Sequence, residues 1–226
     1  MWAAYMLGDG PSLPRWSDDE GQPTASDAGD RHYSCRMTGI EHCPGCPYRE
    51  FGPAVGSRGD PAGRVVIVGE APGKQEILQG RPFVGPAGRI LRTSLSKARL
   101  VEADLFITNS IACLPHPVHP RVTAINACRG RLQSELQSYH RDVIVALGAT
   151  ALRALTGQRA VRVLDARKLP PTETPWELVV ATVHPARVLR RPAEIEFLVD
   201  DLVAARRLAV NAGASASPRA AQEEGA

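Results

Sequence analysis

Four short runs of apolar residues, each closed by glycine or by polar residues, constrain the fold of this chain most strongly. They span residues 64–68, 105–108, 143–147 and 178–183. Runs of this length without polar alternation are typical of strands that are buried on both faces. Segments with helical spacing of apolar residues separate them, at 87–98, 123–139 and 150–155, and another follows the last run at 194–208. This alternation predicts an α/β fold, a three-layer α/β/α sandwich with a central, mostly parallel four-stranded sheet.

Length and composition predict one folded domain between two tails. The chain has 226 residues, of which 43% are hydrophobic, and its formal net charge of +3 permits a polyanionic partner without requiring one. Residues 1–32 predict a flexible leader, residues 33–210 the domain and residues 211–226 a disordered tail. No apolar run is long enough to span a membrane, and the first residues make a poor secretory signal. We expect a cytoplasmic monomer without a membrane partner.

Polar or glycine-rich turns follow three of the four apolar runs. The first run leads into residues 69–73 (GEAPG), the second into Asn109 and Ser110, and the fourth into His184 and a proline. In an open parallel sheet, ligands bind outside the carboxyl ends of the strands. If these strands are neighbours, Glu70, Asn109 and His184 converge on one cleft although they lie far apart in the sequence.

Four of the five cysteines predict a metal site. Cys43 and Cys46 form a CxxC motif, whereas Cys113 and Cys128 flank a later loop and Cys35 is left over. In the cytoplasm, such a set indicates a metal or a catalytic role before a structural disulfide. Four thiolates suit zinc or an iron–sulfur cluster. The alternative is that Cys113 and Cys128 are ordinary buried residues.

Five motifs occur in a fixed order along the chain. They are residues 68–76 (VGEAPGKQE), 80–88 (GRPFVGPAG), 108–109 (TN), 145–150 (VALGAT) and 184–190 (HPARVLR). With the cysteine pattern, they resemble family 4 of the uracil-DNA glycosylase superfamily over residues 43–208. The resemblance implies a monofunctional glycosylase of base excision repair, which flips uracil out of single- or double-stranded DNA and hydrolyses its N-glycosidic bond to leave an abasic site. It also implies a structural [4Fe–4S] cluster held by Cys43, Cys46, Cys113 and Cys128.

Three residues are expected to bind the substrate. An enzyme that acts on a base extrudes it from the helix, holds its π face and reads its Watson–Crick edge. Phe83 is placed to stack on the base, and the Asn109 side-chain amide can pair with uracil O4 and N3–H. The resemblance adds Ala71 to this set. Phe83 could instead be an ordinary core residue, and Asn109 a turn residue or helix cap.

Three further residues are expected to be catalytic. His184 could donate a hydrogen bond to uracil O2 as negative charge collects on the departing base. Glu70 or Glu76 could orient or deprotonate the attacking water, and the sequence does not divide these roles. In the alternative interpretation, His184 is a satisfied histidine at a strand end and Glu76 a solvated residue in a first helical turn.

The segment after His184 predicts a contact with DNA. Val188 and Leu189 are flanked by Arg187 and Arg190, and a hydrophobic wedge between arginines suits a loop that enters a groove and grips phosphates. The alternative is a solvated, arginine-rich turn. The glycine-rich loop after the first strand lacks the Lys-Ser/Thr ending of a phosphate-binding loop, which disfavours a nucleotide hydrolase.

Two departures from the family pattern keep other functions open. Ile77 stands where an acidic residue is common, and His119 stands where an arginine is common in a loop one residue shorter than usual. Because imidazole is a competent nucleophile, one alternative is a uracil-DNA binding protein that forms a covalent adduct through His116 or His119. The other alternative is an inactive zinc-bound module.

Overall fold

The structure is a computed structural model that describes residues 53–114, 121–157, 172–174 and 177–215. The strands are β1 (Arg58–Gly59), β2 (Val65–Gly69), β3 (Leu105–Asn109), β4 (Val143–Leu147), β5 (Thr172–Thr174) and β6 (Glu177–Thr182). The α-helices are α1 (Lys74–Gln79), α2 (Pro86–Lys97), α3 (Arg121–Gln137), α4 (Gly148–Thr156), α6 (Pro185–Val188) and α7 (Ile195–Ser215). Two 3₁₀ turns, η5 (Glu102–Asp104) and η6 (Pro192–Glu194), complete the described elements.

The strands form one sheet in the order β1-β3-β2-β4-β6-β5. Strands β3, β2, β4 and β6 are mutually parallel and correspond to the four predicted strands, so the predicted fold class is confirmed. The edge strands β1 and β5 are antiparallel to their neighbours and were not predicted. They contain two and three residues, which is too short for a pattern of alternation to be visible in the sequence.

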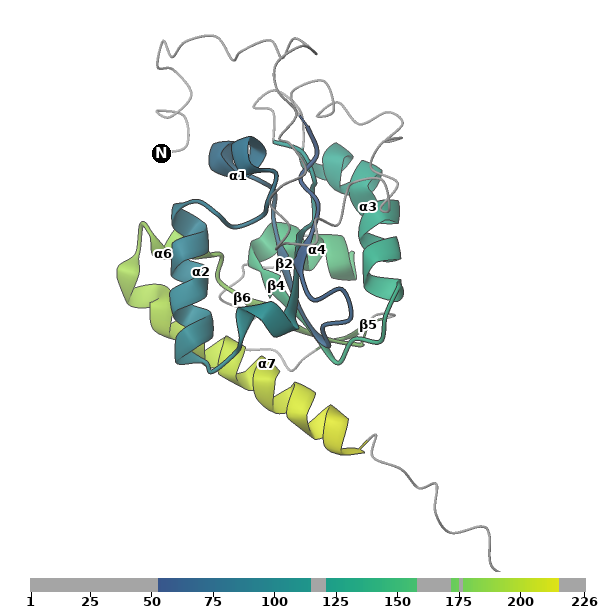
Figure 1. Cartoon of the computed structure of the whole chain (residues 1–226), viewed down its shortest axis with the longest axis vertical. Helices are drawn as coiled ribbons and strands as arrows, with labels where there is room; N and C mark the ends of the chain where they lie inside the picture. The colour runs from purple at the N-terminus through teal and green to yellow at the C-terminus, as the bar shows by residue number, and fades with distance from the viewer. Residues whose placement is uncertain (1–52, 115–120, 158–171, 175–176, 216–226) are drawn as a thin grey trace, which may run out of the picture. The chain divides into compact units, whose positions relative to one another are not determined.

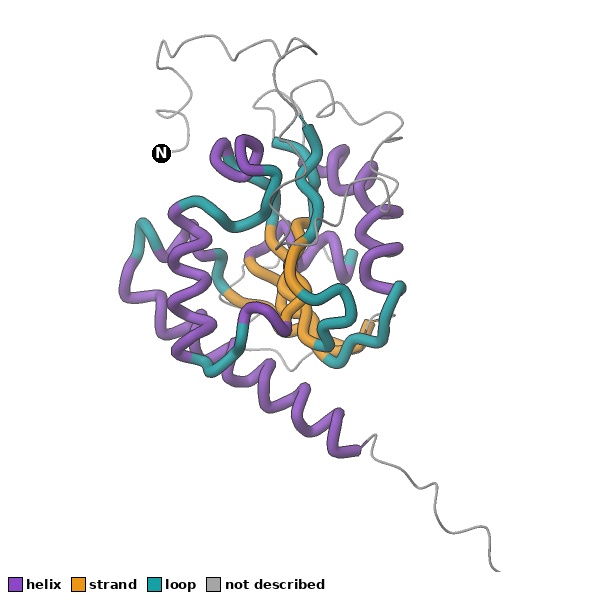
Figure 2. Tube along the Cα trace, viewed as in Figure 1, coloured by secondary structure: helices purple, strands orange, loops and turns teal. Residues whose placement is uncertain are grey.

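Helices cover both faces of the sheet and make three layers, as Figures 1 and 2 show. Alternate residues of each strand point to opposite faces. Val65 and Ile67 therefore pack with α2 and α7, whereas Val66 and Val68 pack with α3 and α4. After β2 the chain continues to the face covered by α2, whereas after β3 and β4 it continues to the opposite face, covered by α3 and α4. The ends of these strands are thus left open between diverging connections, which is where parallel sheets bind ligands.

Helix boundaries differ from the sequence prediction mainly at the ends. Helix α3 begins two residues before the predicted Thr123, and α1 was foreseen only in the alternative interpretation that placed Glu76 in a first helical turn. Helix α7 continues to Ser215, so the predicted start of the C-terminal tail at residue 211 falls inside this helix. None of the helices in the described ranges is long and apolar enough to cross a membrane.

Candidate active site

The ends of β2 and β3 bring together a glycine, an amide and an aromatic ring. Gly69 and Asn109 are the last paired residues of the two strands. A methyl group at Gly69 would lie 2.3 Å from Asn109 Oδ1 and 2.5 Å from Phe83 Cζ. Only hydrogen fits in such a space, so the glycine is needed for the ring and the amide to approach each other here.

Phe83 is held in an unusual backbone conformation. Its φ is 57°, in the left-handed region that residues with a Cβ adopt rarely. Gly88 permits this turn, because a Cβ there would lie 1.8 Å from the Phe83 carbonyl oxygen, and Arg92 donates a hydrogen bond of 3.1 Å to the same oxygen. The ring is buried and meets the His184 ring at a centroid distance of 6.1 Å and an angle of 32°. Local strain of this kind is typical of functional sites.

The Asn109 side chain is an unsatisfied polar group in the core. Only 4% of the residue is exposed, and its Oδ1 is buried without a hydrogen-bond partner among the described residues. A buried acceptor left unpaired costs about 1–3 kcal/mol, so native proteins usually satisfy it. An unpaired amide oxygen beside an aromatic ring indicates a place for a planar ligand with an N–H donor.

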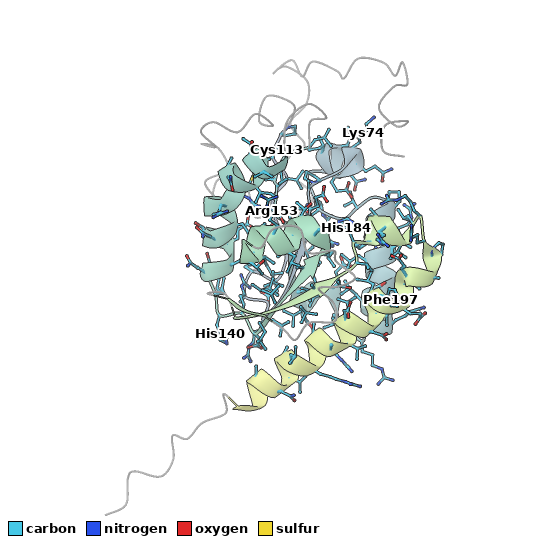
Figure 3. The ribbon with its side chains drawn as sticks, turned by 180° about the vertical axis from the view of Figure 1, so that it is seen from behind. Lys74, Cys113, His140, Arg153, His184 and Phe197 are labelled. Carbon is cyan, nitrogen blue, oxygen red and sulfur yellow. The ribbon has the colours of Figure 1, made fainter. Side chains whose placement is uncertain are left out.

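His184 lies at the end of β6 as the N-cap of α6, and Figure 3 shows it among the side chains near the end of the sheet. Its Nδ1 accepts a hydrogen bond of 3.1 Å from the Ala186 backbone N–H. Burial lowers the pKa of this imidazole and outweighs the nearby Glu70 carboxylate, which raises it, while Arg190 lowers it further. The neutral ring therefore carries its proton on Nε2, which is available to donate. The Phe83 ring thus lies near both Asn109 and His184, and Glu70 lies close enough to His184 to affect its pKa.

Two glutamates follow β2, and the structure gives them different partners. The Glu76 carboxylate is buried and accepts backbone hydrogen bonds from Gly73 (3.1 Å) and Gly85 (2.8 Å), so both of its oxygens hold the loop between α1 and α2. Glu70 Oε2 accepts a hydrogen bond of 2.9 Å from the Thr150 hydroxyl of α4. Glu70 is therefore oriented by a side chain, whereas Glu76 closes a backbone loop.

Comparison with known proteins assigns the family. The model of the uracil DNA glycosylase superfamily matches residues 57–205. The chain belongs to this superfamily. It is 37% identical over 165 residues to the type-4 uracil-DNA glycosylase of Pyrobaculum aerophilum, a match that covers 68% of this chain and 83% of the relative. The chain is also similar to the type-4 uracil-DNA glycosylases of Thermotoga maritima (34% identical over 163 residues, 71% of this chain and 85% of the relative) and Sulfurisphaera tokodaii (30% over 177 residues, 74% and 80%).

Two of the predicted metal ligands of this superfamily member lie in one apolar cluster. Cys113 and Cys128 are both buried and unbridged, and Ala71, the third predicted substrate-binding residue, packs against the same cluster. Cys43 and Cys46 lie outside the described residues, and within the described ones no three side chains of the metal-binding types are grouped. Figure 3 places Cys113 at the opposite end of the structure from His140.

The predicted DNA-binding segment of this glycosylase-family fold is divided between core and surface. Val188 is 2% exposed and packs in the core, so the prediction that it forms part of a surface wedge is wrong. Leu189 is 46% exposed, and Arg190 is also exposed. Arg187 donates two hydrogen bonds to Glu194, of 2.5 Å and 2.7 Å, which close the turn after α6.

Sequence reasoning missed two residues that contact the site of this superfamily member. Thr150 was seen only as part of a motif, because a threonine two residues into a helix shows nothing of a partner 80 positions away. Arg131 was not singled out, since an arginine on a helix usually faces solvent. In the structure it is buried behind the end of β3. The only available signal was its spacing of three and four residues from Cys128 and Glu135.

Proposed function

We propose that this protein is a monofunctional uracil-DNA glycosylase, which flips uracil out of DNA, hydrolyses the N-glycosidic bond and leaves an abasic site. The observation that carries the proposal is the buried, unpaired Asn109 Oδ1 beside the Phe83 ring and the His184 imidazole. Membership of the uracil DNA glycosylase superfamily supports the same reaction.

Base recognition follows from the hydrogen-bonding pattern of an amide. Asn109 Oδ1 accepts from uracil N3–H, and the amide nitrogen donates to O4. Cytosine presents an acceptor at N3 and a donor at the 4-position, which would leave both buried groups of Asn109 facing groups of their own kind. Phe83 supplies the flat surface against which the extruded base stacks.

Leaving-group departure is assisted by His184. As the glycosidic bond breaks, negative charge collects on the base, and Nε2–H donates to uracil O2. Because the pKa of the imidazole is lowered, His184 is neutral at pH 7. It donates a hydrogen bond without placing a positive charge in the buried site. By analogy with oxyanion holes, one well-placed donor stabilises such a transition state by about 3–4 kcal/mol.

Activation of the attacking water is assigned to Glu70. The Thr150 hydroxyl bonds Glu70 Oε2 and holds the carboxylate in one orientation, in which it can direct the attacking water and offset positive charge on the sugar. Glu76 is less suited, because its two oxygens already accept backbone hydrogen bonds. We therefore propose that Glu76 supports catalysis by shaping the loop that carries Phe83.

DNA is bound through the turn after His184. Leu189 is the exposed apolar side chain that fills the space left by the flipped base, and Arg190 is placed beside it to contact phosphates. A role for Arg187 in direct contact stays a prediction, since its guanidinium is paired with Glu194. This ion pair instead supports the shape of the turn.

A [4Fe–4S] cluster is the proposed cofactor, held by Cys43, Cys46, Cys113 and Cys128. Cys113 and Cys128 fit this role, because two buried, unbridged thiols in one cluster are a soft ligand pair. The Val55 N–H donates to Ala112 O at 2.8 Å, which brings the chain back beside Cys113. The nine residues from Cys46 to Val55 span up to about 30 Å when extended, so the CxxC motif is within reach. The cluster would supply a covalent cross-link between these segments.

One assay separates the proposed function from its alternatives. Uracil-containing single- and double-stranded oligonucleotides are incubated with the protein. One portion is then treated with alkali to cleave abasic sites, and a parallel portion is run on a denaturing gel without alkali to detect a protein–DNA adduct. Alkali-labile sites without a protein–DNA adduct are expected. An SDS-stable adduct that His116→Ala or His119→Ala abolishes would establish covalent trapping instead; both histidines lie outside the described residues. Colourless protein with stoichiometric zinc and no uracil release would establish the inactive module.

A further inference from the structure

Arg131 on α3 is a buried cation directed at the end of β3. The residue is 7% exposed. Its Nη2 donates to the carbonyl oxygens of Asn109 and Ser110, the latter at 3.2 Å, and its Nη1 donates to Thr108 Oγ1 at 3.2 Å. Three consecutive residues at the strand end are therefore bonded to a single guanidinium, and the central one is the residue proposed to read uracil.

The charge of Arg131 is balanced inside the protein. Glu135, one helical turn further along α3, lies 2.8 Å from Nη1, and its Oε2 accepts a hydrogen bond of 2.7 Å from the Thr108 hydroxyl. Burial lowers the pKa of the Arg131 guanidinium, but the Glu135 carboxylate and the Cys128 sulfur raise it by more. The net shift is upward, so Arg131 stays charged. Cys128 lies on the same helix, three residues before Arg131. One side chain thus contacts both the strand end and its own counter-ion.

The other side of the same strand end is held by backbone contacts from β2. The Ser110 N–H donates to Gly69 O at 2.9 Å, and the Ser110 hydroxyl donates to the same oxygen at 2.8 Å. These bonds fix the spacing between β2 and β3, but they leave the carbonyls of Asn109 and Ser110 to other partners. The orientation of the peptide planes around Asn109, and with it the direction of the amide, depends on what those carbonyls meet.

We propose that Arg131 is a positioning residue for uracil recognition, because its bonds to the Asn109 and Ser110 carbonyls tie the direction of the Asn109 amide to helix α3, which also carries Cys128. The inference rests on the proposed function. It gives the metal-ligand segment an effect on the base pocket through contacts within this chain, since a shift of α3 moves the guanidinium and with it the strand end.

Arg141 offers a matched control at the other end of the sheet. It is also a buried arginine that donates to backbone carbonyls, of Gly63 (2.6 Å) and Glu135 (3.1 Å), and it lies over the Phe106 ring at 4.7 Å. Loss of Arg141 should lower stability through the same kind of unpaired carbonyl, while the bonds of Arg131 to the Asn109 and Ser110 carbonyls stay in place. A purely structural role for Arg131 would make the two arginines equivalent.

The test compares Arg131→Gln, Arg131→Lys and Arg141→Gln in the full-length protein. We measure kcat and KM on uracil-containing DNA, inhibition by free uracil, thermal unfolding, and the NMR signal of the Asn109 side-chain amide. Arg131→Gln should lower kcat by about 10- to 100-fold, weaken uracil inhibition and shift the amide signal, with a small change in KM for DNA. Arg131→Lys should recover part of this loss. Arg141→Gln should lower only the unfolding temperature.

Three outcomes would overturn the inference. They are an unchanged kcat and amide signal in Arg131→Gln, equal losses of kcat in Arg131→Gln and Arg141→Gln, and, where Arg131→Gln does not fold, an unchanged kcat and amide signal in Arg131→Lys. Absence of uracil release by the wild-type protein would end the proposed function instead. In that case the amide signal alone decides on Arg131, because it reports the position of Asn109 without turnover.

Discussion

The two ends of the parallel sheet carry different kinds of buried polar group: charged pairs at the amino end and a neutral amide with an unpaired acceptor at the carboxyl end. At the amino end, Asp142 pairs with Arg64 at 2.5 Å and lies 3.2 Å from His140, and Arg141 donates to Gly63 O. At the carboxyl end, Asn109 Oδ1 is buried and unpaired. The first arrangement closes the sheet, and the second leaves hydrogen-bonding capacity for a ligand. Substitutions at the carboxyl end should therefore change turnover, and those at the amino end should change stability.

The largest effect is expected at the carboxyl end, from removal of the base-reading groups. Asn109→Ala and His184→Ala should each lower kcat/KM on uracil-containing DNA by about 100-fold or more, because each removes one well-placed hydrogen-bonding group. Asn109→Ala also removes an unpaired buried acceptor, so its free energy of unfolding should stay close to that of the wild type. Near-normal turnover in both variants would place the pocket elsewhere.

The two glutamates sharpen the comparison within one loop. Glu70→Gln should lower kcat by about 100-fold, the lower range for loss of a general base, while thermal unfolding changes little. Glu76→Gln keeps one acceptor but loses the other, so it should lower the free energy of unfolding by about 1–2 kcal/mol and reduce kcat less. Kinetics and denaturant unfolding of both variants measure this. A larger loss of kcat in Glu76→Gln than in Glu70→Gln would show that Glu76, and not Glu70, activates the water.

A smaller effect is expected from the residue that orients Glu70. Thr150→Val keeps the side-chain shape but loses the hydroxyl that bonds Glu70 Oε2, and one hydrogen bond of about 1 kcal/mol corresponds to roughly a 5-fold loss of kcat. Thr150→Ser should retain activity. Thr156→Val, which loses a bond to Leu152 O in the same helix, is the control. Equal rates for Thr150→Val and Thr150→Ser would show that Glu70 needs no such partner.

Much of the site at the carboxyl end of the sheet could be predicted from the sequence, for physical reasons. The four buried strands and the turns after them leave strong local signals, so the parallel sheet and the meeting of Glu70, Asn109 and His184 were predicted. The exposure of Leu189 and the burial of Val188 were not predicted. Neighbouring residues at the end of a short helix point in different directions, and which of them is buried depends on what packs against the helix. The roles of Arg131 and Thr150 depend on partners in distant strands and loops, which no local pattern records.

At the amino end, the expected effect is on stability alone. Asp142 is buried beside Arg64 and His140, so Asp142→Asn removes the charge that Arg64 and His140 face while keeping the side-chain shape. It should lower the free energy of unfolding by about 1 kcal/mol, because Arg64 and His140 are largely solvated and their interactions are screened. Turnover at a temperature well below unfolding should equal that of the wild type. A loss of kcat there would show that the two ends of the sheet are coupled.

The smallest effect concerns the pH dependence of the carboxyl end. The pKa of His184 in the folded protein lies below its ordinary value of about 6.5, chiefly because the ring is buried. Above about pH 6.5 the ring is neutral in both the folded and the unfolded chain, so its contribution to stability is complete there and turnover should be flat to about pH 8. As the pH falls from about 6.5 through the folded pKa, the unfolded chain binds a proton first, and stability is lost. Arg190→Gln removes a charge that lowers this pKa, so the His184 NMR titration should move to higher pH; a titration at or above 6.5 in the wild type would contradict the neutral donor.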